Sequence, residues 1–211
     1  MFQFKASDAF LRFCKRARSF RALIFCEGKD DVKVVKAVNE KLGYNIGNDV
    51  AITDCEGINN MALIIPTMTK ACNNVKTEII VMDLNNKAPK GRVEGVVNSL
   101  TVYGLTVINV KEVERFIYLI ETAYDDRSLT TYLILMGNPD LPFKDAKIDD
   151  HILGILVDDG KINKNELEKY NDSKTLVKHI IEDYYRYLMS TEERHIRKHL
   201  DRICIVLEKI R

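Results

Sequence analysis

The sequence predicts an α/β fold in which a four-stranded parallel sheet carries helices on its faces and is followed by a mainly helical C-terminal region. Two observations lead to this prediction. Short apolar runs such as residues 22–26 lack polar alternation, which is typical of strands buried on both faces of a parallel sheet. These runs alternate with segments whose apolar residues recur at helical spacing. Such alternation, with short connections, favours a Rossmann-like sheet with right-handed crossovers.

The first part of the chain supplies these elements in order. A basic helix is expected within residues 1–20, and an α/β domain is expected over residues 21–122. In the first helix of that domain, Val34, Val35 and Val38 share one side, and a glycine follows where a left-handed cap residue belongs. The expected strands are 22–27, 50–53, 78–82 and 105–110, and the expected helices are 7–18, 31–42, 59–68 and 92–103.

The character of the sequence changes after residue 112. The side chains of Val113, Phe116, Ile117 and Ile120 have helical spacing, whereas the apolar run 129–136 fits a helix or a strand. We expect a mainly helical region over residues 123–211, with helices at 150–157, 165–170, 173–189 and 191–210.

Composition narrows the functional classes. The chain has 211 residues, 46% hydrophobic residues and a net charge of +1, which is an ordinary profile for one domain with an appendage. Its five cysteines have no CxxC spacing, so neither a zinc site nor a disulfide framework is expected. No apolar run could span a bilayer and no secretory signal is evident, so we expect a cytoplasmic protein without a membrane partner. Residues 1–21 are strongly basic; this segment either meets phosphates or is a solvated helix face.

Acidic residues follow three of the predicted strands. Glu27 ends the first, Asp54 and Glu56 follow the second, and Asp83 ends the third. Ligands of such sheets bind at the carboxyl ends of strands where the strand order reverses. If the first and third strands are neighbours, about 4.8 Å apart, Glu27 and Asp83 reach one small cation. Asp31 can join them, although it serves equally well as a helix cap, and Asp54 and Glu56 are more typical of loops.

The donor atoms at this edge are carboxylate oxygens, without histidine or cysteine. Such a set suits a hard cation, above all Mg²⁺. The segment Cys26-Glu27-Gly28-Lys29-Asp30-Asp31-Val32, together with Asp83-Leu84-Asn85, resembles the TOPRIM domain over about residues 21–111. The resemblance is greatest to small stand-alone members, to ribosomal-RNA maturation nucleases and OLD-type nucleases, and to small archaeal TOPRIM proteins.

The resemblance implies phosphodiester chemistry on RNA or DNA that depends on Mg²⁺ or Mn²⁺, as in a nuclease, a hydrolase, or a nucleotidyl-transfer enzyme. By position, Glu27 would be the general acid or base, Asp83 the main metal ligand and Asp31 an auxiliary ligand. Gly28 would allow close approach of a phosphate. The basic residues Lys29 and Lys87 at the same edge are candidates for phosphate binding.

One residue departs from the family pattern. The third strand of a TOPRIM domain ends in Asp-x-Asp, whereas this chain has Asn85 in the second position, where an amide oxygen would be a weaker metal ligand. The departure favours an alternative in which the chain is a non-catalytic TOPRIM-like module that binds nucleic acid or a protein. A weaker alternative is a receiver-like phospho-acceptor domain, which also has acids at strand ends but needs a fifth strand followed by lysine.

Overall fold

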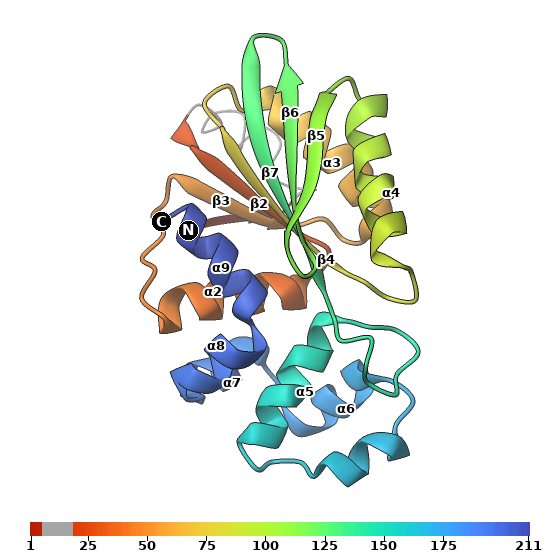
Figure 1. The fold of residues 1–211 in the computed structure, drawn as a ribbon. Coiled ribbons are helices and arrows are strands. Elements are labelled where there is room, and N and C mark those ends of the chain that lie inside the picture. The colour runs from red at the N-terminus through yellow and green to blue at the C-terminus, as the bar shows by residue number, and fades with distance from the viewer. Residues whose placement is uncertain (6–18) are drawn as a thin grey trace.

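The computed structural model describes residues 1–5 and 19–211 and has the predicted α/β class. In these residues, seven strands form one sheet in the order β1-β3-β2-β4-β7-β6-β5 (Figure 1). The helix expected at 7–18 lies outside the described residues. The strands are β1 (Phe2–Lys5), β2 (Ala22–Cys26), β3 (Val50–Asp54), β4 (Thr77–Asp83), β5 (Thr106–Glu114), β6 (Ile117–Tyr124) and β7 (Arg127–Met136).

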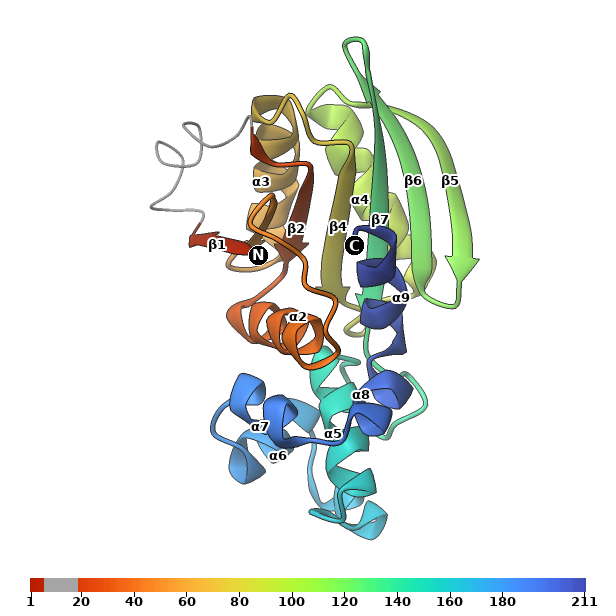
Figure 2. The ribbon, with the colours of Figure 1, turned by 90° about the vertical axis from the view of Figure 1, so that its left-hand side faces the viewer.

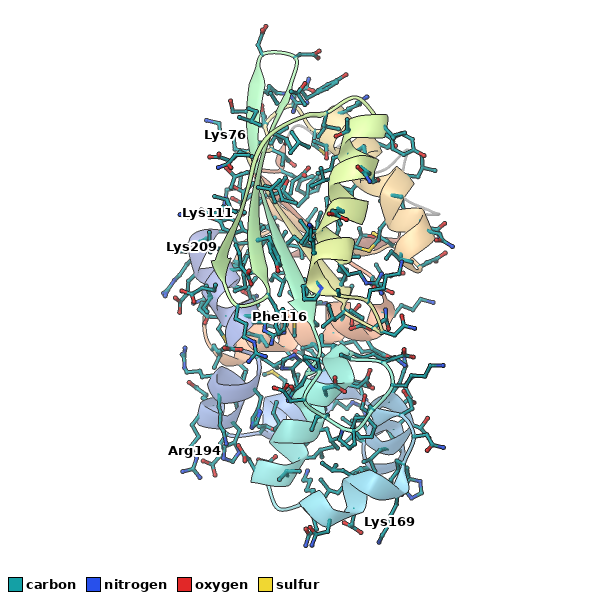
Figure 3. All side chains as sticks on the ribbon, turned by 45° about the vertical axis from the view of Figure 1, so that its right-hand side comes forward. Lys76, Lys111, Phe116, Lys169, Arg194 and Lys209 are labelled. Carbon is teal, nitrogen blue, oxygen red and sulfur yellow. The ribbon has the colours of Figure 1, made fainter. Side chains whose placement is uncertain are left out.

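Helices cover both faces of this sheet. Figure 2 shows α2 and α9 on one face and α3 and α4 on the other, with α5 to α8 beyond the carboxyl ends of the central strands. In Figure 3, Lys76 beside the amino end of β4 and Lys169 in the helical part mark opposite ends of the molecule. The helices are α2 (Lys29–Lys41), α3 (Ile58–Ala71), α4 (Pro89–Val102), α5 (Ile148–Asp158), the 3-10 helix η2 (Lys164–Lys169), α6 (Ser173–Ile180), α7 (Tyr184–Ser190), α8 (Glu193–His199) and α9 (Asp201–Lys209).

The central strands are parallel and buried on both faces, as their apolar runs predict. Strand β2 pairs in parallel with β3 and β4, and β4 pairs in parallel with β7. Successive residues of β2 enter two different cores: Ile24 packs with α2, whereas Phe25 packs with α3 and α4. Because β2 lies between β3 and β4, the ends of β2 and β4 are neighbours.

The prediction of a four-stranded parallel sheet ending in strand 105–110 is wrong in one respect. That segment is β5, which pairs antiparallel with β6 at the sheet edge, while β7 takes the place beside β4. The reason is burial. The residues of β7 from Leu133 to Met136 are fully buried, whereas Lys111 and Glu112 of β5 are exposed and need water.

The prediction of helical structure from Val113 to Ile120 is also wrong, because these residues form the turn and parts of both strands of the β5–β6 hairpin. Phe116 lies in that turn with a positive φ of 66° (Figure 3). The apolar run that fitted either a helix or a strand is β7, and its pairing with β6 and β4 makes it a strand. The domain boundary expected at residue 122 falls inside β6, and the sheet continues to Met136.

The long helices expected at 173–189 and 191–210 are each divided into two. Between α6 and α7 the chain leaves the helix, and the Asp183 carboxylate then caps α7 by accepting from the Arg186 N–H at 3.0 Å. Between α8 and α9, the carbonyl of His199 is bonded to Nδ1 of His151 at 2.7 Å, which diverts it from the helical pattern. Among residues 1–5 and 19–211, no helical segment has the length and hydrophobicity of a transmembrane span.

Candidate functional site

The main chain at Glu27 is fixed by both neighbouring strand ends. Its N–H donates to the carbonyl of Val81 on β4 at 3.0 Å, and its carbonyl accepts from the N–H of Gly57, after β3, at 2.8 Å. Strand β2 ends one residue earlier, so the Glu27 side chain begins where the sheet stops. The sequence therefore places this carboxylate at the carboxyl edge, and the two flanking strands hold its backbone there.

Glu27 and Asp83 meet at this edge. The backbone N–H of Asp83, the last residue of β4, donates to Oε2 of Glu27 at 3.1 Å. The Asp83 side chain is held from the other side, since its Oδ1 accepts from the N–H of Ile148, the first residue of α5, at 2.8 Å. A carboxylate at this position also benefits from the positive end of the helix dipole.

Both carboxylates line one pocket of about 540 Å³ between the sheet edge and the helical region. We call it the acidic pocket. The predicted residues Glu27, Gly28, Lys29, Asp31 and Asp83 all line it. The remaining lining residues are Asp30, Asp54, Glu56, Gly57, Ile148, Asp149 and Lys174.

Asp31, Asp83 and Asp149 of this pocket hold protons more tightly than usual. Burial raises the pKa of Asp31 well above its ordinary value, and the charges of Asp83 and Glu27 raise it further. Burial also raises the pKa of Asp83 to about 7, with Glu27 and Asp149 adding to the effect and the Ile148 N–H opposing it. The two lysines that line the pocket therefore do not fully neutralise its carboxylates, and a cation would stabilise their ionised form.

Asp31 lines the pocket and also caps α2. Its Oδ2 accepts from the N–H of Gly28 at 2.8 Å, which closes the first turn of α2. Asp31 is only 5% exposed, so its carboxylate lies inside the pocket and away from bulk water. The capping role and the metal-ligand role expected from the sequence therefore use the same side chain.

One comparison with known proteins finds a match. The family described as "Protein of unknown function (DUF3226)" matches residues 21–205. The chain belongs to this family. No curated protein and no solved structure matches it. All residues that line the acidic pocket fall inside the matched segment, so the family covers the sheet edge and the helices that close over it.

Two predicted site residues lie elsewhere in this family member. Asn85 does not line the acidic pocket; its backbone N–H and carbonyl both pair with Ala146, at 2.7 and 3.2 Å, and its φ is 52°. Asparagine tolerates this left-handed conformation better than most residues. Lys87 is exposed and lines a different pocket, between α3 and α4.

The helical region adds residues that the sequence analysis missed. Asp149, on the first turn of α5, is 2% exposed and accepts a hydrogen bond from the Tyr184 hydroxyl. Burial raises the pKa of Asp149, while the Tyr184 hydrogen bond and Lys174 oppose the rise. The available signal was the acid pair Asp149-Asp150, which lies directly before an apolar run at the start of the helix expected at 150–157.

Positive charge enters the pocket from α6. Asp30 is paired with Lys178 at 3.3 Å and with Lys174 at 3.7 Å, which links the start of α2 to α6. Lys174 itself lines the acidic pocket, as does the exposed Lys29. These two ammonium groups are placed to attract a phosphate to a site that otherwise repels anions.

The donor set was also tested against the needs of a metal ion. Among residues 1–5 and 19–211, no three Asp, Glu, His or Cys side chains converge closely enough to hold a metal by themselves. Mg²⁺ in phosphate-processing sites is usually held by one or two carboxylates, with water and substrate phosphate completing the shell. The oxygen-only pair of Glu27 and Asp83, with Asp31 beside it, fits that mode and does not fit a cage made of protein ligands alone.

Proposed function

We propose that this chain carries out phosphodiester chemistry on nucleic acid that depends on Mg²⁺ or Mn²⁺, as a nuclease or nucleotidyl-transfer enzyme of the TOPRIM-like kind. The observation that supports this most is the meeting of Glu27 and Asp83, from neighbouring parallel strands, in one pocket whose buried acids have raised pKa values. A pocket at this edge of an α/β sheet whose carboxylates outnumber its two lysines suits a divalent cation and a phosphate-bearing ligand.

Glu27 is the candidate for proton transfer. Its Oε2 is occupied by the Asp83 N–H, and among the described residues no other group donates to this carboxylate. Its orientation is therefore fixed while Oε1 stays available for a proton of the substrate or of water. Asp83 and Asp31 would hold the metal, which when bound polarises a phosphoryl oxygen and lowers the pKa of a bound water. Gly28, Lys29 and Lys174 would receive the phosphate.

A non-catalytic binding module is the second candidate, and one observation favours it. Asn85 replaces the second aspartate of the TOPRIM pattern and lies outside the acidic pocket. The end of β4 therefore supplies a single carboxylate, that of Asp83. Such a site would bind metal and phosphate more weakly. The receiver-like alternative loses support because it needs a fifth strand followed by lysine. Among the described strands, β7 joins β1, β3, β2 and β4 as the fifth parallel strand, and it is followed by Gly137 and Asn138.

Cleavage of labelled RNA and DNA panels with and without Mg²⁺ or Mn²⁺ tests the proposal. Replacing Glu27 by Gln should lower metal-dependent cleavage by roughly 10²- to 10⁴-fold, because loss of a general acid or base has that effect. Glu94→Gln, on the exposed surface of α4, is the matched control and should cleave like the wild type. Equal activity of Glu27→Gln and wild type would refute the assigned role. A metal-induced thermal shift without cleavage would favour the binding module.

A further inference from the structure

A second pocket lies between α3 and α4. These two helices cover the face of the sheet away from α2 and α9 (Figures 1 and 2). The volume of the pocket is about 310 Å³, at the lower end of the range found for small-molecule sites. Ile80 and Met82 of β4 form part of its floor, and Met61 and Ile65 of α3 form part of one wall. We call it the α3–α4 pocket.

The second wall is hollow because α4 lacks side chains there. Gly91 and Gly95, one helical turn apart, line the pocket, and a Cβ added at either would meet no atom within 4 Å. Glycine inside a helix costs about 0.5–1 kcal/mol relative to alanine. The two helices are nevertheless tied together, since the Ser99 hydroxyl donates to the carbonyl of Ala62 at 2.8 Å. The sequence thus retains open space where a side chain would fit.

A buried positive charge lines the same space. Arg92 is only 5% exposed, and its Nε donates to the carbonyl of Leu84 at 3.1 Å. Within residues 1–5 and 19–211, no Asp or Glu lies within ion-pairing distance of its guanidinium, and none lines the pocket. A buried charge without a counterion is costly. The exposed Lys87 adds a second positive charge to the lining.

We infer that the α3–α4 pocket binds a small amphipathic anion. Its apolar part occupies the space beside Gly91 and Gly95, and its carboxylate or phosphate head pairs with Arg92, with Lys87 nearby. A guanidinium suits either head because its planar donors bind two oxygens at once. This site shares no residue with the acidic pocket, so a failure here leaves the proposed phosphodiester chemistry standing, and the reverse also holds.

The methionines give a site-specific assay. Met61 and Met82 line the α3–α4 pocket, whereas Met136 and Met189 lie elsewhere and serve as internal controls. With ¹³C-methyl methionine labelling, millimolar octanoate and octyl phosphate are titrated separately, and neutral 1-octanol is the third probe. We expect at least one anion to move the Met61 and Met82 signals with saturation, at least tenfold more tightly than octanol. The stronger anion identifies the head group as a carboxylate or a phosphate.

Two variants and one control complete the test. Arg92→Gln should weaken the anion by roughly ten- to hundredfold, because hydrogen bonds to charged groups are strong, and leave octanol unchanged. Gly95→Leu fills the space beside α4 and should abolish binding of every probe. This variant does not depend on Arg92, so it tests the site even if Arg92→Gln folds poorly. Lys90→Gln, exposed on α4, should bind like the wild type. The proposal is overturned if neither anion moves Met61 and Met82, if octanol binds as tightly, or if Gly95→Leu binds undiminished.

Discussion

Replacing Asp83 by Asn separates the stability of the acidic pocket from its capacity to bind a cation. The amide is nearly isosteric, and its Oδ1 can still accept from the Ile148 N–H, so the contact with α5 survives. The variant lacks the Asp83 carboxylate, whose ionisation is unfavourable in the folded protein because burial and Glu27 raise its pKa. We therefore expect the metal-free variant to be more stable than the wild type at alkaline pH.

The magnitude follows from the pKa difference. The pKa of Asp83 rises from 3.8 to about 7 on folding, and one unit corresponds to about 1.4 kcal/mol, so the upper limit is about 4 kcal/mol. Between these two values the native state binds more protons than the unfolded state. Wild-type stability should therefore fall as pH rises through this window, and the penalty is complete above pH 7. The variant lacks this fall, so its advantage should be near zero at pH 4 and largest at pH 8.

Urea denaturation followed by circular dichroism measures this difference, since the chain has no tryptophan for fluorescence. At pH 8, Mg²⁺ at ten times its Kd should then stabilise the wild type by about 1.4 kcal/mol and leave Asp83→Asn unchanged. Asp126→Asn, in the exposed turn between β6 and β7, is the control and should follow the wild type in both respects. The reasoning is refuted if Asp83→Asn is no more stable than the wild type at pH 8.

Three further predictions concern the fold. Glu78 is fully buried, and burial raises its pKa from 4.5 to about 7. Wild-type stability should therefore fall by up to about 3 kcal/mol as the pH rises from 5 to 8, and Glu78→Gln should not show this fall, as measured by urea denaturation midpoints. Ile152→Ala, at a fully buried position in α5, should destabilise by about 2–5 kcal/mol in the same assay, whereas Ile108→Ala on β5, 63% exposed, should change little. Gly95→Ala should raise stability by about 0.5–1 kcal/mol, seen as a higher Tm.

The central parallel strands were predictable because a strand that is buried on both faces appears in the sequence as an unbroken apolar run. Glu27 and Asp83 were placed at the sheet edge for the same reason, since each directly follows such a run. The run that became β7 was not assignable, because a short apolar segment fits a helix or a strand until its neighbours are known. Its partner β4 is about 50 residues earlier in the chain, and no local pattern reports that pairing.

Contacts between distant parts of the chain also explain why two residues of the acidic pocket were not predicted from the sequence. Asp149 and Lys174 reach it only because α5 and α6 return to the carboxyl ends of the strands. Nothing near either residue in sequence indicates that return. The reverse error occurred at Asn85 and Lys87, which follow Asp83 closely but lie outside the pocket, because the chain turns toward Ala146 and α4 after β4.

The acidic pocket has a base from the sheet and a roof from the C-terminal helices, which are separated by the whole β5–β7 segment. Exchange of α5 and α6 would replace the roof, while α9 stays on the sheet and Glu27 and Asp83 keep their places. Relatives could thus diverge in which molecules they admit while inheriting the same carboxylates. For protein engineers, the helical portion is accordingly the place to graft new selectivity, and trimming it would leave Asp83 without its Ile148 anchor.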